Sequence, residues 1–267
     1  MALVARLAAQ RALPSGRENS RSVVAVITAG GRVDGPFAQR IGTEVKALAP
    51  IGPRTLIDAA IDAARGVGVE RVSVVGGEAV MRHCGDRIDE MIAEDAEGHE
   101  NLRRAICAAN DRPLLLMTSD MPFVETESLR AFISAARGVD VALPIASEKA
   151  YRAAYPGAPG HATAIGSERV VNGSVALFAP GVGERVLPAA QRLFDARKSL
   201  WSMALVLGPR LVALFALGRL QIRDIEERAA AALGVRAAAI RNASPALCYD
   251  VDTLEDYCYA IARITPD

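Results

Sequence analysis

The chain has 267 residues, of which 51% are hydrophobic and only 4% aromatic, a composition that favours many helices packed on a sheet over an all-β fold. Its 31 basic and 31 acidic residues balance and form no long block of one sign, so the electrostatic footprint of a nucleic-acid-binding protein is missing. The length allows one large domain or two small ones. We therefore expect small-molecule partners and no nucleic acid.

The beginning of the chain and the cysteines indicate where the protein works. Arg6 and Arg11 interrupt the apolar residues of 1–21 and no small-residue cleavage site follows, so we expect a flexible N-terminal extension rather than a secretory signal. The cysteines are far apart and have no C-x-x-C spacing, which predicts reduced thiols: Cys84, Cys107, Cys248 and Cys258. Both features favour a cytoplasmic protein.

The first half of the chain alternates between strand and helix patterns. Val23–Thr28 is a β-branched run that passes into a glycine-containing loop, and Thr55–Arg65 has apolar residues at helical spacing. The alternation continues with strands at Arg71–Val75, Leu114–Met117 and Val141–Pro144 and with helices at Asn101–Ala109 and Thr126–Ala136. This order predicts an α/β fold with a doubly wound, mostly parallel sheet.

The second half predicts less regular structure. We expect an irregular excursion over Tyr151–Gly173, a strand at Ser174–Ala179, several helices in 183–233, extended segments at Ala237–Ile240 and Leu247–Val251, and a closing helix at Leu254–Ile264. The apolar run Leu200–Leu217 contains Pro209 and Arg210, which favours a buried helical hairpin over contact with a membrane. We expect one domain over 22–267 with a helical insertion at about 183–233; the alternative is a separate helical subdomain.

The loop after the first strand is the first candidate site, because open α/β sheets bind ligands beyond the carboxyl ends of their strands. It consists of Ala29, Gly30, Gly31 and Arg32, and Lys46 follows later. Adjacent glycines allow backbone N–H groups to approach phosphates, and the two basic side chains can neutralise them, although the pair also fits an ordinary turn. Neither G-x-G-x-x-G nor the P-loop motif is present, so the sequence supports neither a dehydrogenase with hydride chemistry nor a P-loop ATPase.

Aspartates supply the second and third signals. Asp120 ends the apolar strand that precedes Pro122, where a carboxylate can bind Mg²⁺ or cap the next helix. If 249–252 is extended, Asp250 and Asp252 point to one face, and paired acids are tolerated when a divalent cation or a basic group lies between them. The competing interpretation is that Asp252 or Thr253 caps the closing helix.

The histidines carry no comparable signal. His83, His99 and His161 are too scattered to form a zinc site or a catalytic set, so we expect surface or loop positions for them.

Five features, taken in order, resemble one family: the strand followed by Ala-Gly-Gly-Arg, the later Lys46-Ala47-Leu48, the Thr118–Phe123 strand end, the strand with Asn172-Gly173 and the terminal Asp250–Asp256 segment. They are similar to the NTP transferases related to molybdenum cofactor guanylyltransferases and cytidylyltransferases. The resemblance covers about 23–179 and 248–262 and implies a Rossmann-like nucleotidyltransferase fold.

The resemblance also implies roles for these residues. The loop Ala29, Gly30, Gly31 and Arg32 would hold the NTP phosphates, Lys46 would contact the phosphates or the acceptor, and Asp120 with Asp250 or Asp252 would bind Mg²⁺. Asn101, at an expected helix start, would lie near the nucleotide, and its alternative role is that of an N-cap. The expected reaction transfers a nucleoside monophosphate from an NTP of unknown base to a small phosphorylated acceptor and releases pyrophosphate. The expected protein is a monomer or homodimer without membrane contact.

The chain also departs from the family pattern. Gly31 is followed directly by Arg32, and Val45 replaces the usual proline before the lysine, so we expect the phosphate geometry to differ from that of the family. The late strand is preceded by Val171-Asn172-Gly173-Ser174, so we expect acceptor recognition to differ or to be lost. Two alternatives stay open: a nucleotide-sugar-dependent glycosyltransferase, and a nucleotide-binding relative without turnover.

Overall fold

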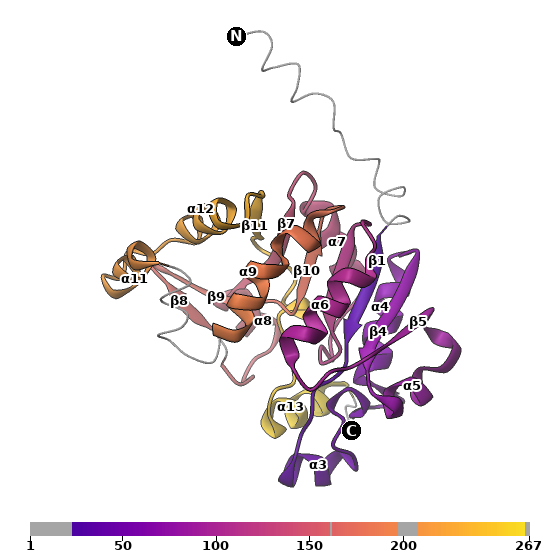
Figure 1. Cartoon of the computed structure of the whole chain (residues 1–267). Helices are drawn as coiled ribbons and strands as arrows, with labels where there is room; N and C mark the ends of the chain where they lie inside the picture. Colours follow the sequence, from indigo (N-terminus) through magenta and orange to yellow (C-terminus); the bar gives the residue numbers. More distant parts are fainter. Residues whose placement is uncertain (1–22, 161, 197–207, 265–267) are drawn as a thin grey trace.

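The computed structural model describes residues 23–160, 162–196 and 208–264 of the chain. A nine-stranded sheet runs through this part (Figure 1). Its strands follow the order β5 (Glu90–Ala93), β4 (Arg71–Gly76), β1 (Val24–Thr28), β6 (Leu114–Thr118), β10 (Val175–Phe178), β7 (Val141–Ser147), β9 (Glu168–Asn172) and β8 (Thr163–Ile165), and β11 (Ala237–Ile240) also pairs with β7.

The sheet is mixed but mostly parallel, as the alternating sequence pattern predicts. β5, β4, β1 and β6 are parallel neighbours, and β11 is parallel to β7. β10 runs against both β6 and β7, and β9 runs against β7 and β8. The predicted strand at Ser174–Ala179 therefore exists, and it is one of the two that run against the general direction.

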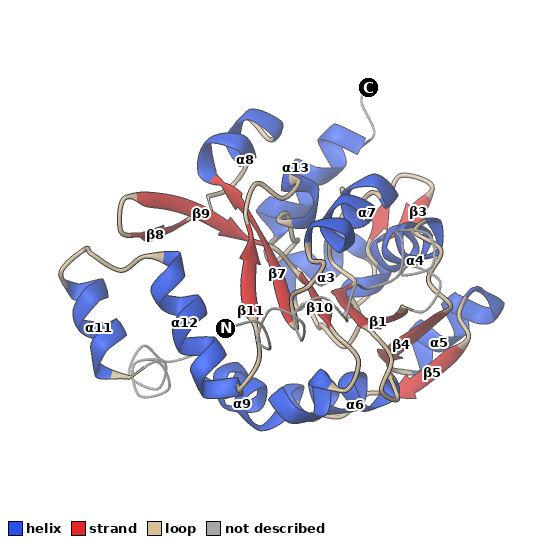
Figure 2. Ribbon diagram, turned by 90° about the horizontal axis from the view of Figure 1, so that it is seen from above, coloured by secondary structure: helices blue, strands red, loops and turns tan. Residues whose placement is uncertain are grey.

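Helices cover both faces of the sheet, which confirms the doubly wound fold class (Figure 2). One face carries α4 (Leu56–Gly66), α7 (Thr126–Ala135), α8 (Glu148–Ala154) and α13 (Leu254–Ile264), and the other carries α6 (Gly98–Ala108), α9 (Val182–Ala196) and α12 (Ile222–Leu233). Each face has its own buried apolar cluster, because alternate residues of the strands point to opposite sides.

Shorter elements connect these layers at one edge of the sheet. They are α3 (Gly35–Ile41), the 3₁₀ turn Lys46–Leu48, the hairpin β2 (Pro50–Ile51) and β3 (Arg54–Thr55), α5 (Glu78–Cys84) and the 3₁₀ turn Gly85–Arg87. Sequence patterns predict none of them, because each is too short to show a period.

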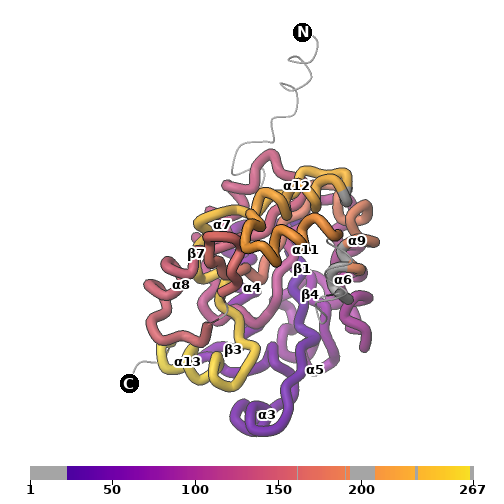
Figure 3. Tube along the Cα trace, turned by 90° about the vertical axis from the view of Figure 1, so that its left-hand side faces the viewer, coloured from indigo at the N-terminus to yellow at the C-terminus, as the bar shows by residue number. Residues whose placement is uncertain are grey.

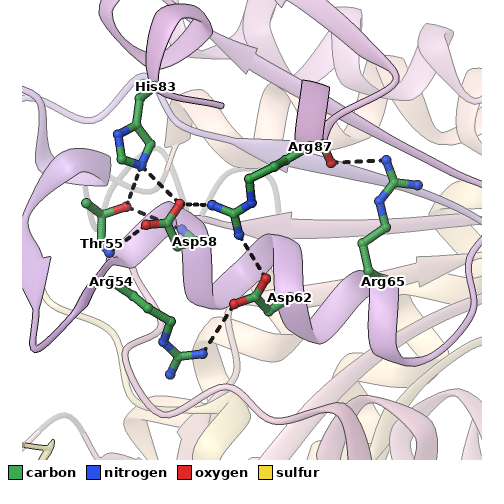
Figure 4. Close-up of polar contacts among 7 residues, drawn as sticks. All are labelled: Arg54, Thr55, Asp58, Asp62, Arg65, His83 and Arg87. Atoms are coloured by element: carbon green, nitrogen blue, oxygen red, sulfur yellow. Dashed lines mark hydrogen bonds and ion pairs between the residues drawn. The ribbon is translucent and has the colours of Figure 1, made fainter. Parts of the chain in front are cut away.

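A polar cluster fixes the beginning of α4 (Figure 4). Thr55 caps the helix by accepting from the N–H of Asp58, whose carboxylate accepts the N–H of Thr55 at 2.8 Å. The same carboxylate contacts His83 Nε2 at 3.0 Å and the guanidinium of Arg87, which reaches Asp62 at 2.8 Å. His83 lies on α5 within this structural cluster and is exposed, which agrees with the predicted surface position.

The C-terminal helix lies beside segments from the beginning of the chain (Figure 3). The hydroxyl of Tyr257 on α13 donates to the Pro50 carbonyl at 2.8 Å, and its ring packs on Phe37 with centroids 5.5 Å apart. The predicted bounds of this helix, Leu254–Ile264, are confirmed. This packing brings the residues just before α13 to the edge where β1 and β6 end.

Two predicted segments are wrong. Tyr151–Gly173 is not irregular, because it holds the end of α8 and the antiparallel pair β8 and β9, joined by a short turn with Gly166 at a φ of 58°. Leu247–Val251 is not a strand: Pro245–Leu247 forms a 3₁₀ turn, and the chain then continues without a ladder partner. In both places glycine and proline hid the periodicity on which the prediction depended.

The apolar run Leu200–Leu217 is also different from its prediction. Its first part, 200–207, lies outside the described residues, and the remainder is mostly α11 (Pro209–Ala216). Phe215 and Leu217 keep 59% and 69% of their surface exposed, so this part is not a buried hairpin. Within the described residues, no helix has both the length and the apolar character that a membrane span needs.

The expected extension at 1–21 and His161 also lie outside the described residues. The predicted helices of 183–233 are present as α9, α11 and α12. α9 packs on α6 and contributes Val182 and Val186 to the second apolar cluster, so this helix belongs to the layer on that face.

Candidate active site

A cavity of about 530 Å³ opens at the carboxyl ends of β1 and β6, beside the start of β10. Its walls come from the loop after β1, the segment before α6, the end of β6 and the residues around Gly173; the lining side chains include Thr28, Lys46, Asp95, Asn101, Leu116, Ser119, Asp120, Leu143 and Ser174. This is the edge where open α/β sheets bind ligands, as the sequence predicts.

Lys46 joins two acidic segments that are far apart in the sequence. Its ammonium nitrogen lies 2.5 Å from Asp120 Oδ2 and 3.1 Å from Asp252 Oδ1. Only 14% of the Lys46 side chain and 12% of the Asp120 side chain are exposed, whereas Asp252 keeps 59% exposed. Burial alone disfavours the ammonium, but the two carboxylates outweigh it and raise the pKa of Lys46 above its ordinary value.

Asp120 does not cap the helix that follows it. The N-cap of α7 is Glu125, so the alternative role suggested by the sequence is excluded. The backbone carbonyl of Asp120 accepts the N–H of Val251 at 2.9 Å, which ties the end of β6 to the acidic segment before α13. Its Oδ1 is buried and has no hydrogen-bond partner among the described residues. A buried carboxylate oxygen without a partner is the atom that a cation would satisfy.

Asp250 and Asp252 have separate surroundings. Asp250 accepts a hydrogen bond from the Ser174 hydroxyl at 3.2 Å, whereas Asp252 contacts Lys46. The cap of α13 is Thr253, whose hydroxyl accepts from the N–H of Asp256 at 3.2 Å while the Asp256 carboxylate accepts the Thr253 N–H at 2.8 Å. Both predicted aspartates are therefore released from the capping role.

Buried aromatic rings hold this acidic segment in place. Tyr249 is fully buried, and its hydroxyl donates to the backbone carbonyl of Asp256 at 2.9 Å. Its ring packs against Phe123, just after β6, and against Tyr155, with centroids 4.9 and 5.2 Å apart. The rigid packing fixes where the neighbouring Asp250 lies.

The glycine loop has backbone groups available for an anion. The N–H of Ala29 extends the β1 ladder by donating to Val75 at 2.8 Å, whereas in the described chain neither the Gly30 N–H nor the Gly31 N–H has an acceptor. A side chain on Gly31 would crowd Lys46, because its Cβ would lie 3.1 Å from Lys46 Cε. The loop therefore approaches Lys46 closely.

Arg32 points elsewhere. Its guanidinium pairs with the Glu94 carboxylate and donates to the Gly30 carbonyl at 3.0 Å, and it does not line the cavity. Among the residues expected to hold phosphates, Gly30, Gly31 and Lys46 line the cavity, whereas Arg32 and the buried Ala29 do not. Glu94 carries no sequence signal, because it follows a short strand without a clear pattern.

Asn101 lines the cavity but is not an N-cap. α6 begins three residues earlier, with Glu97 as its N-cap. The Asn101 side chain instead accepts the Asp95 N–H at 2.6 Å and donates to the Asp95 carbonyl at 2.9 Å. Arg104 adds an ion pair to Asp95 at 2.7 Å, so these residues shape one wall of the cavity. The sequence gives no reason to select Asp95 or Ser174.

The aspartates at the cavity could bind a divalent cation only if a bound ligand supplied further oxygen atoms. In the described ranges, no three His, Cys, Asp or Glu side chains gather closely enough to hold a metal by themselves. Mg²⁺ is commonly bound through one or two carboxylates together with substrate phosphates. The unpartnered Oδ1 of Asp120 and the nearby acidic segment fit that arrangement.

A mostly parallel sheet with a glycine loop, a lysine and aspartates at its carboxyl edge is typical of α/β proteins that bind a ligand at this edge. Residues 25–202 match the family model of the MobA-like NTP transferase domain. The chain belongs to this family of nucleotidyltransferases.

Solved structures of similar fold agree with this family. A hypothetical transferase from Thermus thermophilus is 26% identical, with a TM-score of 0.77 over 87% of this chain and 98% of that protein. A nucleotidyl transferase from Methanothermobacter is 18% identical, with a TM-score of 0.56 over 91% and 97%. The manganese complex of Rv0371c from Mycobacterium tuberculosis is 20% identical, with a TM-score of 0.50 over 91% and 98%. The last two establish a shared fold alone. No curated protein matches the sequence.

Proposed function

We propose that the protein is a Mg²⁺-dependent nucleotidyltransferase that moves a nucleoside monophosphate from an NTP to a small phosphorylated acceptor and releases pyrophosphate. One observation carries the proposal: the Lys46 ammonium contacts Asp120 and Asp252 inside the cavity that the Gly30-Gly31 loop lines. Carboxylates and a lysine at one point are the groups needed to bring two phosphates together.

The phosphate groups are assigned to the loop side of the cavity. The unpaired N–H groups of Gly30 and Gly31 would donate to phosphate oxygens, and Lys46 would turn from the carboxylates toward the triphosphate. Arg32 would join only after leaving Glu94. Asn101 would act through Asp95, by holding the wall beside the nucleotide.

Asp120, together with Asp250 or Asp252, would hold Mg²⁺. When bound, the ion supplies neutralisation of the phosphate charge at the point of transfer. The manganese complex of a similar fold supports a divalent metal in this type of protein. Asp250 is tied to Ser174 and Asp252 to Lys46, so the metal would displace one of these contacts.

The chain's own residues then position the reactants. An acceptor phosphate or hydroxyl attacks the α-phosphorus in line with the departing pyrophosphate, so no nucleophilic side chain is needed. Lys46 would neutralise charge as the two anions approach, and the residues that line the cavity would fix their alignment.

Pyrophosphate release from ATP, CTP, GTP and UTP with Mg²⁺ and a set of phosphorylated acceptors tests the proposal. Asp120→Ala is expected to abolish release while retaining the wild-type circular dichroism spectrum. Asp86→Ala is the matched control, because Asp86 is exposed on the 3₁₀ turn after α5. Full activity of Asp120→Ala would refute the assignment.

Two other results would favour one of the alternative functions. Release of free nucleoside diphosphate from nucleotide sugars would indicate a glycosyltransferase, and tight NTP binding without turnover would indicate a binding protein.

The domain organisation, location and oligomeric state of the protein are also proposed. We place one domain over 22–267, with 183–233 as its helical insertion, preceded by an extension at 1–21. None of the four cysteines forms a disulfide, which supports a cytoplasmic location, and we propose a monomer or homodimer.

A further inference from the structure

A second cavity, of about 180 Å³, lies between the sheet and α12. Its lining is almost entirely aliphatic and comes from β7, β8, β9, β11 and α12; it includes Leu143, Ile145, Ile165, Val170, Ile222, Ile225, Ala229 and Ala238. Ile145, Val170 and Ile222 form a small buried cluster distinct from the two main ones. These side chains surround a space instead of filling it.

The cavity offers few polar groups. The Glu226 carboxylate already accepts the Ala239 N–H at 2.8 Å. The Asn172 side chain forms no hydrogen bond with the rest of the described chain. A nucleobase needs several polar groups to fix its edge, so this lining is better suited to a hydrocarbon group.

This apolar cavity adjoins the candidate active site. Leu143 and Gly173 line both cavities. Leu143 keeps 49% of its surface exposed. It pairs with Ala239 of β11 on one side, and the register of β7 with β10 ends at Ala142 on the other, so space is open beside Leu143. Leu143 therefore connects the apolar lining of the second cavity with the candidate active site.

Residues 172–174 connect the second cavity with Asp250. Asn172 lines the apolar cavity, Gly173 lines both, and Ser174 donates to Asp250, one of the carboxylates proposed to hold Mg²⁺. A side chain at Gly173 would lie 2.5 Å from Pro144 Cγ, so only glycine fits this passage. A molecule whose apolar part fills the second cavity would have its other end near Asp250.

We propose that this second cavity binds the hydrocarbon part of the acceptor, which is therefore a phosphate ester of a compact apolar group. The inference rests on the proposed function, because the acceptor's phosphate is placed at the metal and Lys46. The size agrees, since an apolar cavity of about 150 Å³ in another protein binds benzene.

Calorimetric titration with methyl, butyl and hexyl phosphate, with Mg²⁺ present, tests this inference on the full chain. Each added methylene is expected to tighten binding about three- to fourfold, up to about six carbons. Ala229→Leu fills the cavity and is expected to remove the dependence on chain length. Ala231→Leu, exposed on the same helix and outside the lining, is the matched control that keeps it.

Ile225→Ser is a second variant, because Ile225 lines the second cavity and not the candidate active site: it is expected to weaken hexyl phosphate and leave methyl phosphate unchanged. Equal affinity for methyl and hexyl phosphate in the wild type, or an undiminished chain-length dependence in Ala229→Leu, would overturn the inference. A loss of NTP affinity in Ala229→Leu would overturn it as well, since the cavity would then hold the base. Failure of pyrophosphate release with the chain-length dependence intact would instead refute the proposed transfer.

Discussion

Replacing Lys46 by methionine removes the ammonium between two carboxylates and retains a side chain of similar length. At an effective dielectric constant of about 20, a charge pair at 2.5 Å has a Coulomb energy of roughly 7 kcal/mol before desolvation. Removing one partner of a buried pair costs about 3–5 kcal/mol net. With 14% of Lys46 and 12% of Asp120 exposed, we expect a loss near the lower limit, about 3 kcal/mol.

Thermal unfolding followed by circular dichroism measures this loss. The expected decrease in Tm is about 6–12 °C for Lys46→Met. For Asp252→Asn it is below about 4 °C, because that carboxylate is 59% exposed and its pair is worth about 0–1 kcal/mol. Lys46→Met is also expected to lower kcat for pyrophosphate release about 100- to 1000-fold. Equal Tm values for the two variants, or wild-type turnover in Lys46→Met, would refute the reasoning.

Two further predictions concern the loop and the cluster at α4. Gly31→Ala is expected to raise KM for the NTP without lowering Tm, because the new Cβ would lie only 3.1 Å from Lys46 Cε. Gly160→Ala is the control, because its new Cβ would meet no atom closer than 3.7 Å. An unchanged KM in Gly31→Ala would contradict the prediction. Burial opposes ionisation of Asp58, but hydrogen bonds from Thr55, His83 and Arg87 outweigh it and hold its pKa below the ordinary value. This stabilisation is present above the unfolded pKa and is lost as pH falls through the folded pKa. Urea unfolding should therefore show Asp58→Asn less stable than the wild type by about 1–2 kcal/mol at pH 7, and the difference should shrink below about pH 4; a constant difference would contradict the linkage.

The fold could be predicted from the sequence wherever elements are long and periodic. β1, α4 and α13 lie within about a residue of their expected bounds, because apolar spacing alone selects the face that is buried. The β8 and β9 hairpin and the 3₁₀ turn at Pro245–Leu247 were missed, because short segments rich in glycine and proline have no period and are stabilised by tertiary packing.

The sequence predicted which charged residues form the candidate site better than it predicted which of them contact one another. Asp120 follows β6 at the sheet edge where ligands are expected, whereas the roles of Lys46 and Asp252 beside it came from the family resemblance. That Arg32 pairs with Glu94, and that Asn101 holds Asp95, depends on side-chain directions in loops that no sequence pattern specifies. The second cavity depends on how α12 packs on β11, which spacing alone does not determine.

A crystal structure grown with Mn²⁺ and a non-hydrolysable NTP tests the central claim most directly. The anomalous signal of manganese is expected beside Asp120 and one of Asp250 and Asp252, with the triphosphate over Gly30 and Gly31 and the Lys46 ammonium turned toward it. Manganese bound by other side chains, or a triphosphate outside this cavity, would contradict the account.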